Sequence, residues 1–143
     1  MPAYVLDASA LLAFLNREPG ADAVGPLVES SVISSVNWAE VLQRATNLGM
    51  EILVVRRYLE SFGLGVLPFT MEDAGYTAQL WLTTRQAGLS LGDRACLSLA
   101  HRLGLPALTA DSSWATLDLD IEVRLIRWGS AEGRPSLSDC AAY

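Results

Sequence analysis

The stretch Ala3-Tyr4-Val5-Leu6-Asp7-Ala8-Ser9 opens the chain with a short apolar run that ends in an acid. A run of this length, without polar alternation, is typical of a strand that is buried on both faces. Similar short runs recur at Val32–Ser34, Gly65–Phe69, Leu105–Thr109 and Val123–Ile126. Helical segments separate the runs, so the sequence predicts an α/β fold whose central sheet is mostly parallel and covered on both faces.

Apolar residues at helical spacing predict the segments between the strands. The predicted helices are Ala10–Leu15, a weakly helical Ala21–Ser30, Asn37–Leu48, Ile52–Phe62, Glu72–Ala87 and Leu91–Leu103. The third and fourth of these form a helical hairpin, and its many apolar residues cannot all face one core. We expect this hairpin to offer a docking groove or a dimer interface.

The large side chains of the chain are assigned mainly to packing. We expect Trp38, Trp81 and Trp128 in the core, and Trp114 packed near Asp111. His101 is expected to face solvent, because it lies off the apolar stripe of its predicted helix. A single domain over residues 1–128 accounts for these elements, and residues 129–143, rich in Ser, Gly and Ala, are expected to form a flexible tail.

The charge balance of the chain is unfavourable for a protein that binds nucleic acid. The 143 residues carry a formal net charge of −6, whereas phosphate neutralisation supplies most non-specific affinity. However, all 10 basic residues are arginine, the residue best suited to bidentate phosphate contacts. A bound metal ion can also invert the sign of an acidic cluster.

The residues that the chain lacks exclude several classes of enzyme. Without lysine there is no P-loop and no Schiff base. A single histidine leaves little room for a Ser-His-Asp system or a multi-histidine zinc site. Cys96 and Cys140 lack ligand-type spacing, and a reduced, cytoplasmic protein is expected, with no signal segment and no apolar run near the roughly 20 residues that span a bilayer. Carboxylates are the only groups available in number for catalysis.

Four of these carboxylates occupy equivalent places in the predicted fold. Asp7 and Asp111 end the first and fourth strands, and Glu40 and Asp93 lie in the first turns of predicted helices. Ligands of parallel sheets bind at the carboxyl ends of the strands, so the four acids are expected to meet at one edge. Two carboxylates about 5 Å apart repel by about 3 kcal/mol at an effective dielectric near 20, and a cation would relieve this cluster. An all-oxygen cluster suits Mg²⁺ or Mn²⁺.

Helix capping is the alternative explanation of the same acids. Asp7 and Asp111 can cap the helices that follow them, and Asn37 with Glu40, like Ser90 with Asp93, has capping-box spacing. Capping is the better explanation for each acid alone, whereas the metal cluster is the better one for all four together. If the acids are only caps, the chain is a non-catalytic interaction module of a DNA-bound repressor complex, with the hairpin as its working surface.

Each of the four acids lies in a short segment, and these segments are Tyr4–Ala10, Ile33–Val41, Leu91–Cys96 and Leu108–Trp114. In their sequence and order the segments resemble PIN-domain nucleases, with the greatest similarity to VapC-type toxins of bacterial toxin–antitoxin pairs. The resemblance implies a PIN-like three-layer α/β/α sandwich with a five-stranded parallel sheet. It also implies Mg²⁺-dependent RNA cleavage, homodimerisation and inhibition by a cognate antitoxin.

The same resemblance assigns roles to individual residues. Asp7, Glu40, Asp93 and Asp111 would hold the metal, and Ser9 and Thr109 would support the site by hydrogen bonding. From its position, Arg94 either contacts substrate phosphate, orients Asp93 or lies on the surface. A PIN nuclease that processes RNA or cuts DNA, without being a toxin, is a further alternative.

Overall fold

The predicted central sheet is present, and all of its strand pairs are parallel. The computed structural model describes residues 1–127, and the strand order is β3-β2-β1-β4-β5. The strands are β1 (Tyr4–Leu6), β2 (Ser31–Ser34), β3 (Gly65–Leu67), β4 (Ala107–Thr109) and β5 (Val123–Leu125). The first strand of the chain therefore lies in the middle of the sheet.

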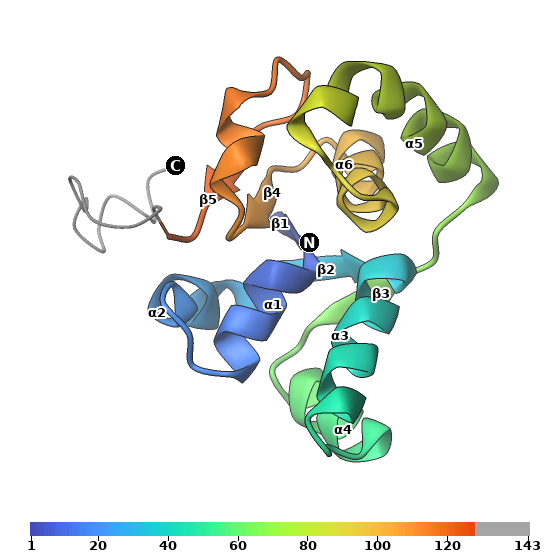
Figure 1. Ribbon diagram of the computed structural model, residues 1–143. Helices are drawn as coiled ribbons and strands as arrows, with labels where there is room; N and C mark the ends of the chain where they lie inside the picture. Colours follow the sequence, from blue (N-terminus) through green and yellow to red (C-terminus); the bar gives the residue numbers. More distant parts are fainter. Residues whose placement is uncertain (128–143) are drawn as a thin grey trace.

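Helices cover both faces of this sheet and give the expected three layers (Figure 1). They are α1 (Ala8–Leu15), α2 (Ala21–Val24), α3 (Ser35–Asn47), α4 (Ile52–Ser61), α5 (Met71–Thr84) and α6 (Leu91–Leu103). Three short 3₁₀ helices complete the elements: η1 (Gly25–Ser30), η2 (Arg85–Ala87) and η3 (Ser112–Thr116). Figure 1 shows α1 to α4 on one side of the sheet and α5 and α6 on the other.

Each face of the sheet has its own apolar core, because successive strand residues point to opposite faces. Leu6, Ile33 and Leu108 pack into the core under α1, α3 and α4. Their neighbours Val5, Val32 and Ala107 pack into the core under α5 and α6. This is why the strands are continuous apolar runs rather than alternating ones.

Prolines account for two differences from the predicted strand boundaries. The predicted strands Gly65–Phe69 and Leu105–Thr109 are shorter in the structure, because Pro68 and Pro106 cannot donate a backbone hydrogen bond to a sheet. The predicted helix Ala21–Ser30 is divided into α2 and η1, with a proline in the first turn of η1. The element types are otherwise as expected.

Among the tryptophans within the described residues, only Trp81 differs from its predicted place. Trp114 is only 1% exposed, and Trp38 packs half-buried against the α3 core. Trp81 was expected in the core but is 47% exposed. The buried stripe of α5 consists of Asp73, Thr77, Leu80 and Thr84. Trp81 lies off this stripe and instead stacks under the Arg85 guanidinium, 5.1 Å from its ring centre.

His101 is exposed, as expected, and its ring stacks on Tyr76 with centroids 4.0 Å apart. Among residues 1–127 no helix has the length and hydropathy needed to span a membrane. Trp128, Cys140 and the predicted tail 129–143 lie outside the described residues. The domain boundary predicted at residue 128 therefore stays a prediction.

Candidate metal centre

The candidate centre lies at the carboxyl end of β1, where the order of the sheet reverses. From β1 the chain proceeds outward to β2 and β3, and it then returns to place β4 on the other side of β1. In parallel α/β sheets such a reversal opens a crevice at the strand ends, where ligands bind. Asp7 follows β1 directly and is only 3% exposed, so it lies at the bottom of this crevice.

Three donors hold the buried carboxylate of Asp7. The backbone N–H of Ala10 donates to Oδ1 at 2.8 Å, so Asp7 also caps α1. The Ser9 hydroxyl lies 2.7 and 2.8 Å from the two oxygens, and the Thr109 hydroxyl donates to Oδ2 at 2.5 Å. A carboxylate has roughly four lone-pair positions, and three donors leave one available to a further ligand.

The backbone after β4 fixes the direction of both hydroxyl groups. The N–H of Ala110 donates to Ser9 Oγ at 3.0 Å, and the N–H of Asp111 donates to Thr109 Oγ1 at 3.1 Å. Each hydroxyl accepts a hydrogen bond from the backbone and donates its own hydrogen bond to Asp7. The structure thus brings Ser9 and Thr109 into hydrogen-bond contact with Asp7, with the orientation of both hydroxyls set by the backbone after β4.

Asp93 lies in the first turn of α6 and forms a capping box there with Ser90. Its Oδ2 accepts the backbone N–H of Ser90 at 2.9 Å, whereas Oδ1 has no hydrogen-bond partner among residues 1–127. Asp93 interacts electrostatically with each of the other three acids, Asp7, Glu40 and Asp111. It is therefore the central member of the acidic group.

Glu40 lies deeper in its helix than the sequence predicted. The helix α3 begins at Ser35 and is capped by Ser34, so Glu40 lies in the second turn. The predicted capping box between Asn37 and Glu40 is wrong for the same reason. The Asn37 side-chain amide instead donates to Glu40 Oε2 at 3.0 Å and to the backbone carbonyl of Gly92 at 2.9 Å.

Asp111 follows β4 and is exposed. Its Oδ1 accepts the backbone N–H of Ser113 at 2.9 Å and the Ser113 hydroxyl at 2.7 Å, which caps η3. Capping therefore takes part in the placement of three of the four acids, and only Glu40 caps nothing. In Asp93 and Asp111 the capping contacts use only one oxygen, so for these two acids capping is compatible with a metal site.

The environment of the acidic group disfavours its full ionisation. Burial raises the pKa of Asp7 from 3.8 to about 6, against the lowering effect of Thr109, Ala10 and Ser9, and the charge of Asp93 adds to the rise. Burial also raises the pKa of Glu40, with a further contribution from Asp93. For Asp93, burial and then the charge of Asp111 raise the pKa. A bound cation would offset each of these costs.

The donor set fits a hard divalent cation, although the side chains are not closed around one position. All four groups are carboxylates, which are ligands that suit Mg²⁺ and Mn²⁺. Asp93 and Asp111 each keep one oxygen without a hydrogen-bond partner in the described part of the chain. Within residues 1–127, however, no three His, Cys, Asp or Glu side chains stand close enough to hold an ion without moving.

Two neighbouring residues bear on the chemistry of the centre. Cys96 is fully buried beside the acids, and burial together with the charge of Asp7 raises the pKa of its thiol well above the ordinary value. Cys96 therefore stays a neutral thiol. The Arg94 guanidinium donates to the Thr77 carbonyl on α5 at 2.9 Å, so the structure ties Arg94 to α5 rather than bonding it to Asp93.

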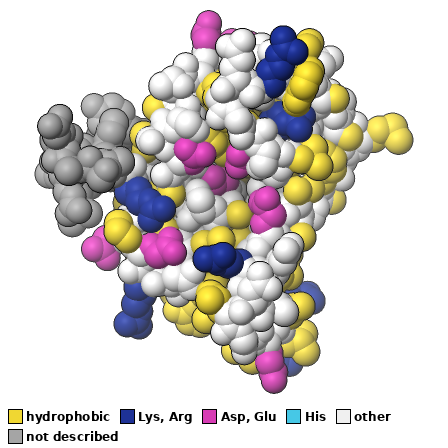
Figure 2. Space-filling view, viewed as in Figure 1, with side chains coloured by type: hydrophobic (Ala, Val, Ile, Leu, Met, Phe, Trp, Pro, Cys, Tyr) yellow, Lys and Arg dark blue, Asp and Glu magenta, His cyan; other side chains and the backbone are white. Residues whose placement is uncertain are grey.

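Acidic side chains gather near the middle of the molecular face seen in Figure 2. From Glu40, a depression of about 380 Å³ extends along α1 and α3 to Arg44 and Asn47. The roles of Asn37 and Gly92 beside Glu40 are not apparent in the sequence. The sequence does show a polar residue, Asn37, one helical turn before Glu40, but helix capping explains this spacing equally well.

The profile of the PIN domain family matches residues 4–119 of the chain. A comparison with curated protein sequences gives no significant match. The family match covers β1 to β4 and all four acids, so it spans every part of the candidate centre.

Solved structures share the fold at low sequence identity. A toxin–antitoxin complex from Klebsiella pneumoniae has a TM-score of 0.65 at 19% identity, covering 80% of this chain and 92% of that one. DNA-bound VapBC from Salmonella typhimurium has a TM-score of 0.66 at 19% identity, covering 88% and 99%. VapC20 of Mycobacterium tuberculosis, described as a toxin that cleaves the sarcin–ricin loop, has a TM-score of 0.66 at 15% identity, covering 93% and 100%.

Proposed function

This chain belongs to the PIN domain family, and on that premise we propose that it is a Mg²⁺-dependent endoribonuclease acting as the toxin of a toxin–antitoxin pair. The observation that carries the proposal is the electrostatic coupling of four carboxylates, through Asp93, at the carboxyl edge of the sheet. Carboxylates brought together in this way, with the pKa of Asp7, Glu40 and Asp93 raised, are typical of functional sites.

Asp7, Glu40, Asp93 and Asp111 are the residues that would hold the ion, with Mn²⁺ as a substitute for Mg²⁺. When bound, the ion polarises the scissile phosphate and offsets the negative charge that develops on it. Asp7 is fixed by three donors, so it supplies a rigid position at the bottom of the crevice. Asp111 is exposed and lies toward the solvent side, where a polymer substrate enters.

RNA is the proposed substrate, for reasons of shape and of surface chemistry. Glu40 lines an open depression rather than a closed cavity, and Arg44 lines the same depression. An arginine placed there can contact a phosphate next to the one that is cut. The description of VapC20 as an RNA-cleaving toxin supports the same substrate class by similarity of fold.

Calorimetry with Mn²⁺, together with RNA cleavage in the presence of Mg²⁺ or a chelator, tests the metal dependence. We expect Asp93→Asn to lose Mn²⁺ binding and cleavage together, because it neutralises the central acid of the group. Asp118→Asn is the matched control, because Asp118 is exposed and lies in the loop after η3, outside the acidic group. Wild-type rates of cleavage by Asp93→Asn would show that the carboxylates are not the metal ligands.

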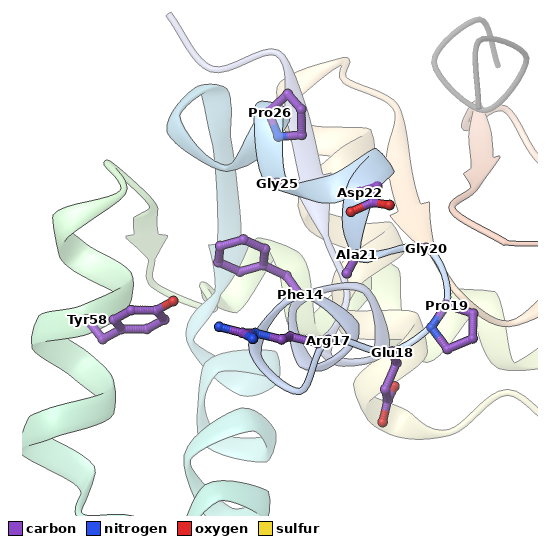
Figure 3. A pocket seen from close by; sticks show the side chains of 10 residues that line it. All are labelled: Phe14, Arg17, Glu18, Pro19, Gly20, Ala21, Asp22, Gly25, Pro26 and Tyr58. Atoms are coloured by element: carbon purple, nitrogen blue, oxygen red, sulfur yellow. The ribbon is translucent and has the colours of Figure 1, made fainter.

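The toxin role requires an antitoxin, and we propose that an antitoxin helix docks on the hairpin of α3 and α4. This hairpin exposes seven large apolar side chains: Leu48, Met50, Ile52, Leu53, Val54, Tyr58 and Phe62. Beside it, a cleft of about 590 Å³ separates Tyr58 on α4 from the end of α1. Figure 3 shows the Arg17 side chain extending toward Tyr58 below the ring of Phe14. Several structures of the same fold were solved as toxin–antitoxin complexes.

Co-expression with a short neighbouring reading frame, followed by size measurement in solution, tests this docking surface. Leu53→Asp is expected to weaken the complex, and Leu82→Asp on α5 is the control because Leu82 is equally exposed (60% and 66%). If Leu53→Asp dissociates a homodimer and leaves antitoxin binding unchanged, the hairpin is the dimer interface instead. The proposed homodimer is measured in the same experiment.

One observation favours the non-catalytic alternative, the interaction module of a repressor complex. Asp7, Asp93 and Asp111 all cap helices, which gives them a structural role without any metal. Calorimetry separates the two functions, because a module would show no carboxylate-dependent binding at millimolar metal. Cleavage without any antitoxin partner would indicate an RNA-processing PIN nuclease that is not a toxin.

A further inference from the structure

The side-chain amide of Asn37 connects α3 to α6 inside the protein. Asn37 is 1% exposed, and its Nδ2 donates to Glu40 Oε2 at 3.0 Å and to the Gly92 carbonyl at 2.9 Å. The second contact joins residues that are 55 positions apart in the sequence. A buried amide with partners on two helices fixes the distance between them at this point.

The chemistry of the two partners determines which way the Asn37 amide faces. A glutamate carboxylate and a backbone carbonyl both accept hydrogen bonds, so only the NH₂ group can satisfy them. The Oδ1 atom of Asn37 is consequently left buried without a partner among the described residues. Leaving an acceptor buried and unpaired is unfavourable, and the contact with Glu40 and Gly92 is kept in spite of it.

Gly92 provides the space in which the Glu40 carboxylate lies. A Cβ atom added at Gly92 would lie 2.2 Å from Glu40 Oε1, 2.7 Å from Cδ and 2.8 Å from Oε2. Gly92 has no positive φ, in contrast to Gly88 and Gly104 at either end of the same helical region. Glycine is unfavourable inside a helix, so the carboxylate, not the backbone conformation, is the reason for a glycine here.

We infer that Asn37 and Gly92 are positioning residues for Glu40, and that together they hold its carboxylate against the first turn of α6 beside Asp93. Glu40 is the one acid of the four that caps no helix, so no local backbone contact fixes it. Asn37 restrains it through a hydrogen bond, and Gly92 leaves room for it. The consequence for metal binding rests on the proposed function, whereas the contact itself does not.

Gly92→Ala separates this role from a general role in folding. The atoms that the new methyl group would meet belong to the end of the flexible Glu40 side chain. We therefore expect the protein to fold, with Glu40 displaced and Mn²⁺ affinity reduced ten- to hundredfold, the usual cost of losing a residue that orients a ligand. Gly75→Ala on α5 is the matched control, because nothing lies within 4 Å of a Cβ atom there.

A double-mutant comparison shows whether Gly92 acts through Glu40. In a Glu40→Ala background, adding Gly92→Ala should change Mn²⁺ affinity by no more than about twofold, because the displaced group is already gone. Asn37→Ala is a second probe, and it should weaken Mn²⁺ in the wild-type background but not in the Glu40→Ala background. If the losses of Mn²⁺ affinity in Gly92→Ala and Glu40→Ala add up fully in the double variant, the inference is wrong.

A metal-free measurement keeps the inference independent of the proposed function. The NMR signal of the Asn37 NH₂ group should be shifted and protected from exchange in the wild type. The NH₂ proton donated to Glu40 should lose this protection in Gly92→Ala and in Glu40→Ala and keep it in Gly75→Ala, whereas the proton donated to the Gly92 carbonyl should stay protected in all three. If protection is unchanged in Gly92→Ala, the positioning role is wrong. If wild-type protein shows the protected signal but binds no Mn²⁺, the contact stands and the proposed function fails.

Discussion

The helices α5 and α6 begin with the same local structure, yet their first turns have opposite electrostatic environments. Thr70 and Asp73 form a capping box at the start of α5, and Ser90 and Asp93 form one at the start of α6. In both boxes the aspartate is the third residue of the helix, and its Oδ2 accepts the backbone N–H of the capping residue. The backbone role of the two acids is therefore the same.

Their partners outside the turn differ in sign. Arg102 donates to both oxygens of Asp73, at 2.8 and 3.1 Å. Although burial opposes it, this arginine holds the pKa of Asp73 below its ordinary value. For Asp93, burial and then the charge of Asp111 raise the pKa, although the hydrogen bonds of Ser90 and the charge of Arg94 oppose them. A capping box thus fixes where a carboxylate lies. Residues from other elements then determine whether the charge of that carboxylate is neutralised within the protein, as at Asp73, or not, as at Asp93.

The largest contrast is expected in catalysis. Asp93→Asn should reduce RNA cleavage about a thousandfold, as expected for loss of a group that organises charge stabilisation in the site. Asp73→Asn should leave the rate of the folded protein nearly unchanged, because Arg102 and not a metal is its partner. Single-turnover cleavage of one RNA substrate by the two variants measures the contrast. Equal losses of cleavage rate in the two variants would contradict this prediction.

The pH dependence of stability is expected to have opposite signs at the two kinds of acid. Asp7 shares the environment of Asp93, and its pKa rises from 3.8 to about 6 on folding. The folded state then binds the proton more tightly, so this contribution is fully present below pH 3.8 and is lost as pH rises through 6. The loss is about 3 kcal/mol. Asp73 contributes the reverse, because its stabilisation is lost as pH falls.

Urea unfolding between pH 4 and 7 without metal measures this dependence. Asp7→Asn should flatten the fall in stability across pH 4 to 6, and millimolar Mn²⁺ should flatten it in the wild type. A wild-type stability that rises steadily over the same pH range, unchanged by Asp7→Asn, would contradict the raised pKa.

The same pair of substitutions should change stability in opposite directions. Asp73→Asn keeps the hydrogen bond to Thr70 but leaves Arg102 without its charge partner, at a cost of about 2 kcal/mol, reduced because the Arg102 side chain is 26% exposed. Asp93→Asn keeps the hydrogen bond to Ser90 and removes repulsion, so the metal-free protein should be equally or more stable. Denaturation midpoints of the metal-free variants at neutral pH measure both changes in stability. A similar loss of stability in Asp73→Asn and Asp93→Asn would contradict the prediction.

The smallest expected effect comes from the capping residues themselves. Thr70→Ala and Ser90→Ala should each cost about 1 kcal/mol, because each removes one side-chain cap. Only Ser90→Ala should also weaken Mn²⁺ binding, because it lets the Asp93 carboxylate turn. Calorimetry on the two variants sharpens the comparison, and a similar loss of Mn²⁺ affinity in Thr70→Ala would contradict it.

The sequence predicts the sheet and the position of the acids at the strand ends because both depend on local patterns. Short apolar runs identify the strands, and an acid directly after a strand, as at Asp7, lies at the carboxyl edge of a parallel sheet. The spacing of Ser90 and Asp93 predicts the first turn of α6 correctly. These features need only a few neighbouring residues.

What the sequence does not predict depends on contacts between distant segments. Nothing local distinguishes Asp73 from Asp93, because Arg102 lies 29 residues from Asp73. Ser34 and Asn37 both have side chains that can cap a helix, and the Asn37 side chain does not cap α3 because it contacts the Gly92 carbonyl on α6. The size of Trp81 predicts a place in the core, whereas the residues of α5 that are buried against α6 are largely polar. In each case the deciding partner comes from another element.

The central position of β1 determines when the site can first exist during synthesis. Asp7 is synthesised before the residue that holds its Oδ2, because that hydroxyl comes from Thr109, 102 residues later. At roughly 5–20 residues per second, a growing chain carries Asp7 for on the order of ten seconds before that partner is made. With this strand order, the Asp7 carboxylate stays without its Thr109 partner until the chain has been synthesised through β4.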